Sequence, residues 1–184
     1  MSMQFNSTII DVQAILRHAQ LKMGDSIADF GTGREGKIAL PAARLVGKEG
    51  TVYAVDIVKV ILPAVQTKAK LHGLENVTTV WSDLEIYGAT RTIRDNFLTA
   101  GFLVTVLFQS KKRQEMMQEC HRTIRPGGRL VVVDWKPGVN SPLGPIDTMR
   151  VHPSEIKKIA EDLHMQLVEE FEAGPYHWGL VFLK

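Results

Sequence analysis

The chain has 184 residues, 45% hydrophobic and 23% charged, and we expect residues 1–184 to form one globular domain with a core that is stable without disulfides. Its 22 lysines and arginines against 20 aspartates and glutamates give a net charge of +2. That balance does not indicate a dedicated nucleic-acid-binding protein, although RNA is not excluded as a substrate. The single cysteine, Cys120, excludes an intrachain disulfide and a cysteine-rich metal site. Residues 1–20 lack the apolar core of a signal peptide, and no stretch reaches the ~20 apolar residues of a membrane span, so a cytoplasmic location without membrane contact is expected.

The first half of the chain alternates between helical and strand patterns. Apolar residues from Ile9 to Ala19 recur at helical spacing after the candidate cap Ser7, which predicts a leading amphipathic helix within residues 1–22. From residue 23 a second pattern begins. Short β-branched or apolar runs predict strands over 26–30, 51–55 and 77–81, with helices over 38–46 and 59–72 between them.

The second half continues this alternation. Its apolar run between Gly101 and Phe108 is uninterrupted, as in a central parallel strand that is covered on both faces. The elements expected here are a strand over 101–108, a helix over 111–124, a turn at 126–128 and a strand over 129–135.

The last third of the chain begins with a loop rich in proline and glycine over 136–150, which we interpret as a mobile loop over the functional site. A helix capped by Ser154 and ending near His164 follows. Strands over 166–172 and 178–183 come next, and the segment between them is too short for a parallel crossover. These two strands are therefore expected to pair as an antiparallel hairpin.

A glycine-rich turn follows the first predicted strand. Residues 29–36 read Asp-Phe-Gly-Thr-Gly-Arg-Glu-Gly and open the next helix, the context in which a Gly-x-Gly-x-x-Gly pattern indicates a nucleotide-like ligand. Asp29 and Glu35 would repel the pyrophosphate of a dinucleotide. S-adenosylmethionine has no phosphate and carries an ammonium and a sulfonium, so the acidic turn favours this methyl donor.

Two further carboxylates follow the next strands. Asp56 lies about twenty residues past Gly36, the spacing at which an acid reaches ribose hydroxyls in this type of fold. Asp83 follows the third strand, where it can accept from the adenine amine while the N–H of Leu84 donates to a ring nitrogen. Asp29, Asp56 and Asp83 thus stand at the carboxyl ends of neighbouring strands, where open α/β sheets bind ligands.

These segments together resemble the successive motifs of class I S-adenosylmethionine-dependent methyltransferases, especially the small ubiquinone/menaquinone-biosynthesis type. The matching segments are 29–36, 55–57, 82–84 and 124–134. The resemblance implies an α/β fold: a Rossmann-like three-layer sandwich over residues 23–184, with a seven-stranded, mostly parallel sheet in the order 3-2-1-4-5-7-6 and one antiparallel strand. One segment departs from the pattern, because residues 95–102 lack the usual acidic approach to the fourth strand.

The resemblance also assigns donor contacts residue by residue. It places Asp29, Gly31, Thr32 and Gly33 near the methionine part of S-adenosylmethionine, and Phe30 is counted with the same turn. Ile57, together with Asp56, is assigned to ribose and adenine. Leu84, together with Asp83, is assigned to adenine.

The methyl acceptor is expected beyond the fourth and fifth strands, and a small molecule is the expected class. Gln109, Trp135 and His177 are the candidate acceptor contacts. Each has a competing structural interpretation: Gln109 as a cap of the following helix, Trp135 as ordinary packing and His177 as part of an aromatic turn. Methyl transfer depends strongly on positioning, so no catalytic residue is assigned, and no metal site is expected.

Two alternatives stay open from the sequence. One is a protein that binds S-adenosylmethionine without catalysis, and the other is an NAD-linked oxidoreductase. The identity of the acceptor, the methylated atom and the oligomeric state are not determined by these patterns, because one fold hosts many chemistries.

Overall fold

The computed structural model describes residues 9–141 and 143–184 of the chain. Its first half contains α1 (Val12–Ala19), β1 (Ser26–Phe30), α2 (Ala39–Val46), β2 (Thr51–Asp56), the 3-10 helix η1 (Lys59–Ile61), α3 (Leu62–Leu71) and β3 (Val77–Trp81). Its second half contains β4 (Leu98–Val104), η2 (Leu107–Gln109), α4 (Arg113–Thr123), β5 (Ile124–Trp135), η3 (Asp147–Met149), α5 (Pro153–Asp162), β6 (Gln166–Glu172) and β7 (His177–Leu183).

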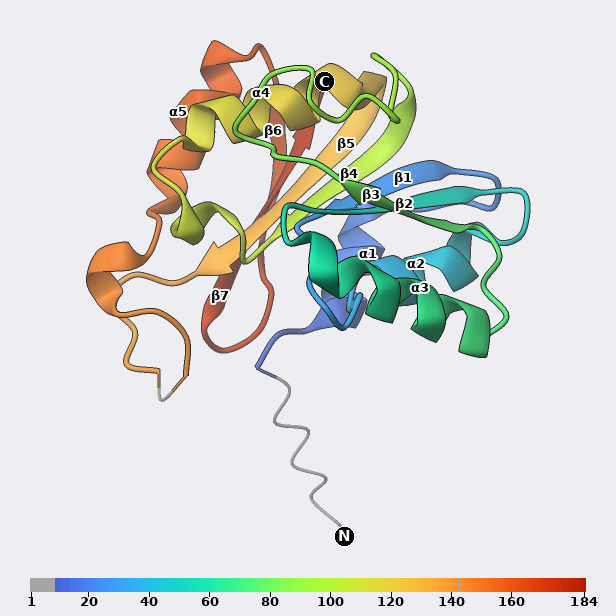
Figure 1. The fold of residues 1–184 in the computed structure, drawn as a ribbon. Helices are drawn as coiled ribbons and strands as arrows, with labels where there is room; N and C mark the ends of the chain where they lie inside the picture. Colours follow the sequence, from blue (N-terminus) through green and yellow to red (C-terminus); the bar gives the residue numbers. More distant parts are fainter. Residues whose placement is uncertain (1–8, 142) are drawn as a thin grey trace, which may run out of the picture.

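The strands of the described residues form one seven-stranded sheet in the order β3-β2-β1-β4-β5-β7-β6. β7 is antiparallel to both of its neighbours, and the other pairs are parallel. Helices cover both faces of the sheet (Figure 1). The structure therefore confirms the predicted three-layer α/β sandwich, its strand order and its antiparallel hairpin.

Each face of the sheet carries its own apolar core. Helices α1, α2 and α3 pack on one face around Phe102, whereas α4 and α5 pack on the other around Leu103 (Figure 1). These two adjacent residues of β4 point to opposite faces, as the pleat of a strand requires. Cys120 is buried in the core under α4 and α5, where it packs as a small apolar side chain.

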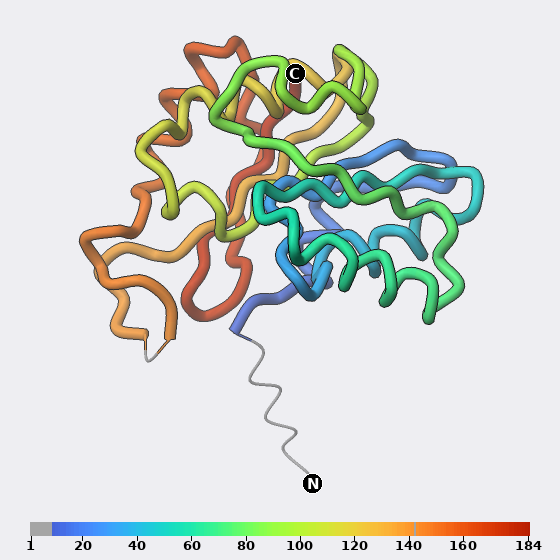
Figure 2. Tube along the Cα trace, viewed as in Figure 1, coloured from blue at the N-terminus to red at the C-terminus, as the bar shows by residue number. Residues whose placement is uncertain are grey.

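The start of the chain differs in detail from the sequence prediction. Helix α1 begins at Val12, and the Asp11 carboxylate caps it by accepting from the N–H of Ala14 at 2.9 Å. The predicted cap Ser7 lies outside the described residues. The described residues just before α1 lie beside the turn between β6 and β7 (Figure 2), where the Asp11 N–H donates to the carbonyl of Ala173 at 2.9 Å.

Three other predicted boundaries are corrected. β4 ends at Val104, not Phe108, because Thr105 adopts a positive φ of 56° and the chain then enters η2. Residues 126–128 lie within β5 as an irregular stretch opposite the start of β4, not as a free turn. The cap of α5 is His152, whose Nδ1 accepts from the N–H of Ser154, so Ser154 is not the cap.

Candidate functional site

A cavity of about 750 Å³ opens at the carboxyl ends of β1, β2, β3 and β4, a size typical of small-molecule sites. It lies at the β1–β4 junction, where the strand order of the sheet reverses and where ligands of open α/β sheets bind. Eleven of the predicted contacts line it: Asp29, Gly31, Thr32, Gly33, Asp56, Ile57, Asp83, Leu84, Gln109, Trp135 and His177. Phe30 does not, because its side chain is fully buried in the core under α4.

The glycine turn is held tightly against the end of β2. The N–H groups of Gly31 and Thr32 both donate to the carbonyl of Val55, at 2.8 and 2.9 Å. Gly31 has a φ of 82°, and a Cβ there would lie 2.4 Å from a methyl of Val106, so glycine is required. A Cβ on Gly33 would meet nothing within 4 Å, which leaves the backbone open to a ligand on that side.

Asp29 fixes the shape of this turn. Its Oδ2 accepts from the hydroxyl of Thr32 at 2.7 Å and from the N–H of Ala39, the first residue of α2, at 3.1 Å. Burial raises the pKa of Asp29 to about 6, against the lowering effect of those two hydrogen bonds. The carboxylate therefore links the turn to the helix behind it and is still mainly charged at pH 7.

Asp56 joins the glycine turn to the segment after β2. One carboxylate oxygen accepts from the N–H of Gly33 and the other from the N–H of Val58, each at 2.9 Å. A carboxylate offers about four acceptor positions, so about two are still free to accept from ligand hydroxyls. The backbone orients this acid before any ligand arrives.

The segment after β3 lines another part of the cavity. Asp83 Oδ1 accepts from the N–H of Glu85 at 2.9 Å, and Leu84 is buried beside it. Ile57 also lines the cavity and is 55% exposed, and its carbonyl accepts from the indole N–H of Trp81 at 2.9 Å. Asp83 thus lines the cavity together with the apolar side chains of Ile57 and Leu84.

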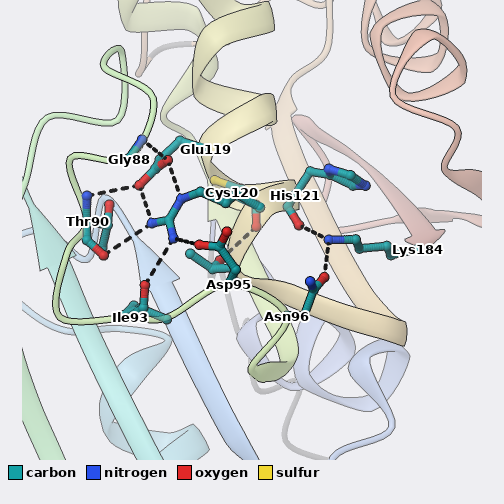
Figure 3. Close-up of polar contacts among 11 residues, drawn as sticks. Gly88, Thr90, Ile93, Asp95, Asn96, Glu119, Cys120, His121 and Lys184 are labelled. Carbon is teal, nitrogen blue, oxygen red and sulfur yellow. Dashed lines mark hydrogen bonds and ion pairs between the residues drawn. The ribbon is translucent and has the colours of Figure 1, made fainter.

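A buried ion pair holds the loop that carries Asp83, as Figure 3 shows. Arg122 of α4 binds both oxygens of Glu119, at 2.7 and 2.9 Å, and donates to the carbonyls of Thr90 and Ile93. Glu119 also accepts from the N–H groups of Gly88 and Thr90. These hydrogen bonds join the loop between β3 and β4 to helix α4.

The electrostatics of this network favour its charged form. Burial acts to raise the pKa of Glu119, but the hydrogen bonds from Arg122, Gly88 and Thr90 outweigh it and lower the pKa. Asp95 also pairs with Arg122, so the segment that departs from the family pattern supplies a structural ion pair. The sequence interpretation missed this network, whose only local signal is the i,i+3 pair of Glu119 and Arg122.

The end of β4 also lines the cavity, although no residue of it was proposed as a contact. Thr105 adopts a left-handed backbone that is strained for a β-branched residue. This bend places Val106 over Gly31 and lets the amide of Gln109 donate to the carbonyl of Thr105 at 2.9 Å. Gln109 does not cap α4, since that position is Lys112.

The far end of the cavity is aromatic. Trp135 and His177 are paired residues of β5 and β7, with ring centroids 4.1 Å apart. Leu143 and Gly144 of the loop after β5 reach the same cavity, and a Cβ on Gly144 would lie 2.6 Å from the indole of Trp135. The loop therefore lies against the site, as predicted, and its mobility stays a prediction.

Asp134 supports this end from behind. It is fully buried and does not line the cavity, and it accepts from the N–H groups of Phe108 and Trp135, at 3.1 and 2.8 Å. Burial raises its pKa to about 7. Its role is to join η2 to the end of β5.

No helix in the described ranges is long and apolar enough to cross a membrane. Residues 9–141 and 143–184 contain no group of three or more His, Cys, Asp or Glu side chains that could hold a metal ion.

Comparisons with known proteins place methyltransferases among the relatives of this chain. The chain is 25% identical over 134 residues to the ubiquinone/menaquinone biosynthesis C-methyltransferase of Blochmanniella floridana, covering 72% of this chain and 51% of that protein. It is 38% identical over 74 residues, 40% of this chain and 39% of the relative, to a probable cobalt-precorrin-6B C(15)-methyltransferase of Methanosarcina mazei. The chain thus spans about half or less of the length of these curated relatives.

A solved structure and a family profile give the same result. The crystal structure of a SAM dependent methyltransferase from Aquifex aeolicus superposes with a TM-score of 0.83 at 23% identity, over 95% of this chain and 90% of that one. The profile of the methyltransferase domain family matches residues 28–132, a range that contains the glycine turn, Asp56, Asp83 and most of β5. The chain belongs to the methyltransferase domain family, which confirms its predicted membership of the class I S-adenosylmethionine-dependent methyltransferase family.

Proposed function

We propose that the cavity binds S-adenosylmethionine and that the protein transfers the methyl group to a small-molecule acceptor. The observation that carries this proposal is the single cavity that joins the glycine turn and two oriented carboxylates to an aromatic end. When bound, the donor supplies a methyl group on a positively charged sulfur. The chain itself supplies binding and orientation, which account for much of the rate of such a displacement.

The donor would extend along the carboxyl ends of β1, β2 and β3. Gly31, Thr32 and Gly33 give close backbone approach for its methionine part, with the charge of Asp29 beneath the turn. Asp56 and Ile57 would hold the ribose, because about two acceptor positions of Asp56 are free. Asp83 and Leu84 would hold the adenine.

The charges at the turn support a cationic donor over a dinucleotide, with one correction. Glu35 is exposed and paired with Lys68, so it contributes less to this preference than the sequence suggested. Asp29 and Asp56 are both buried against the turn. Two acids near one helix N-terminus would repel a pyrophosphate and attract an ammonium and a sulfonium.

The far end of the cavity supports a small molecule as acceptor. Its walls are mainly apolar, with Val104, Val106, Leu143 and Trp135 among them. Such a pocket suits an apolar molecule with one reactive group.

The test follows an isotope-labelled methyl group. The protein would be incubated with S-adenosylmethionine carrying a ¹³C methyl and with small acceptors that bear a hydroxyl, an amine, a thiol or a nucleophilic carbon atom. We expect a labelled product and an equal amount of S-adenosylhomocysteine with one class. Tight binding of the donor without transfer to any of them would instead support a donor-binding protein without catalysis.

A further inference from the structure

His177, at the aromatic end of the cavity, has a ring nitrogen that the described part of the chain leaves without a hydrogen-bond partner. It is 1% exposed at the start of β7 and lines the cavity. Its Nδ1 lies 3.0 Å from the carbonyl oxygen of Ile9. A carbonyl can only accept, so Nδ1 carries the proton and, in the neutral ring, Nε2 presents a lone pair.

That lone pair has no partner within the described residues. Nε2 is buried and makes no hydrogen bond with residues 9–141 or 143–184. Folded proteins seldom leave a buried polar atom in this state unless a ligand, a water molecule or a catalytic role accounts for it. The missing partner must be a hydrogen-bond donor.

The groups around His177 keep the ring neutral. Burial is the main cause that lowers its pKa below 6.5, the carbonyl of Ile9 opposes this effect, and Lys136 and Arg150 add to it. The acids on neighbouring elements face these two cations: Glu172 of β6 pairs with Lys136, and Asp147 of η3 pairs with Arg150. Asp11 faces α1, which it caps. No carboxylate of the described residues is within ion-pair distance of the His177 ring.

The side chains near His177 indicate what kind of molecule could supply the hydrogen-bond donor for Nε2. The indole of Trp135 lies against the ring at a centroid distance of 4.1 Å. Ile10, Leu143 and Val104 line the same cavity. An apolar, flat molecule would contact these walls and bring one polar group to the ring.

We propose that His177 is an acceptor-binding residue whose Nε2 receives a hydrogen bond from an O–H or N–H group of an apolar methyl acceptor and takes up that proton. In this step the O–H or N–H bond breaks, its electron pair stays on the oxygen or nitrogen, and the proton joins the Nε2 lone pair to give an imidazolium. The inference rests on the proposed function and deepens it, because it assigns the acceptor to O- or N-methylation.

The test uses two matched pairs of probes on protein saturated with S-adenosylhomocysteine. Phenol is compared with anisole, and indole with 1-methylindole; in each pair a methyl group replaces the donor proton of the first member. Affinities and the ¹⁵N resonance of His177 Nε2 are measured by NMR. We expect the proton-bearing member of one pair to bind about tenfold more tightly and to shift Nε2, and the pair that responds tells an oxygen from a nitrogen acceptor.

Variants and pH separate recognition from packing. His177→Phe should abolish the preference for the proton-bearing probe, whereas His72→Phe, at an exposed position outside the cavity, should keep it. If the Phe variant does not fold, His177→Gln, which retains a hydrogen-bond donor for Ile9, takes its place in the same comparison. In the wild-type protein the preference should persist at pH 6.5 and disappear at lower pH, as the ring becomes protonated and can no longer accept.

The outcomes distinguish the two proposals. Equal affinity within both pairs, or no binding of any probe, would overturn the role of His177 while donor binding stays intact. Failure of S-adenosylhomocysteine to bind would instead overturn the proposed function on which this role depends.

Discussion

Asp56 is the residue on which donor binding should depend most. Both of its oxygens already accept backbone hydrogen bonds, from Gly33 and Val58, so its orientation costs little when a ligand binds. Its charge also strengthens any hydrogen bond from a ribose hydroxyl.

Replacing Asp56 by asparagine should weaken binding of S-adenosylhomocysteine by about 10- to 100-fold, because a hydrogen bond to a charged group contributes roughly 1.5–3 kcal/mol. Calorimetric titration measures the change. Asp162→Asn, an exposed substitution on α5 outside the cavity, is the matched control and should have no effect. Affinities of the Asp56 variant within a factor of two of the wild type would remove this residue from the donor site.

Asp134 gives a prediction about pH. Burial raises the pKa of Asp134 to about 7 in the folded protein, whereas the ordinary pKa of this side chain is 3.8. The unfolded state therefore binds fewer protons than the folded state between these values, and the burial of Asp134 costs more stability as pH rises.

Asp134→Asn should consequently be less damaging at pH 7 than at pH 5. The free energy of unfolding of the variant relative to wild type should improve by roughly 2 kcal/mol across this interval. Urea denaturation of both proteins at the two pH values measures the difference. A pH-independent difference would show that Asp134 titrates in the folded state much as it does in the unfolded chain.

At the scale of elements, the loop between β3 and β4 depends on helix α4. Arg122 and Glu119 satisfy the backbone of Gly88, Thr90 and Ile93 from within the helix (Figure 3). The loop carries Asp83 at its start, so this network also supports the end of the cavity that we propose for the adenine.

Removing one partner of this pair should be costly. Arg122→Leu leaves Glu119 as an unpaired buried charge and should lower the free energy of unfolding by about 3–5 kcal/mol. Arg125→Leu, at an exposed position two residues into β5, is the control and should stay within about 0.5 kcal/mol. If the two variants lose similar stability in denaturant, the network does not hold the loop.

The sequence predicted the order and type of the elements well because their apolar periodicity is strong. It failed where backbone conformation or tertiary contacts decide the outcome. β4 ends early because Thr105 turns the chain with a positive φ, which no apolar count reveals. The ring of His152 caps α5, whereas the sequence pattern indicated Ser154 as the cap.

The site was predictable to a similar degree. The residues at strand ends were found because the topology brings the carboxyl ends of parallel strands together. Thr105 and Val106 occupy the same kind of position and were missed, since the strand was placed too far along the chain. The contribution of Ile9 depends on a long-range contact with His177 that no local pattern indicates.

At the scale of the whole molecule, one sheet lies between two apolar cores, one on each face. The cavity lies at the carboxyl ends of the strands, beside the β1–β4 pair at which the strand order of the sheet reverses. The residues that line this cavity come from distant parts of the sequence, and they include Ile10 near the start of the chain and His177 near its end. A ligand that bridges them would stabilise the folded state as a whole by mass action.

The most direct test of the account is calorimetric titration of the purified protein with S-adenosylmethionine, S-adenosylhomocysteine and NAD. We predict saturable binding of the first two at micromolar concentration and no binding of NAD, because the buried acids at the glycine turn repel a pyrophosphate. Binding of NAD alone would contradict the assignment of the donor and the function derived from it.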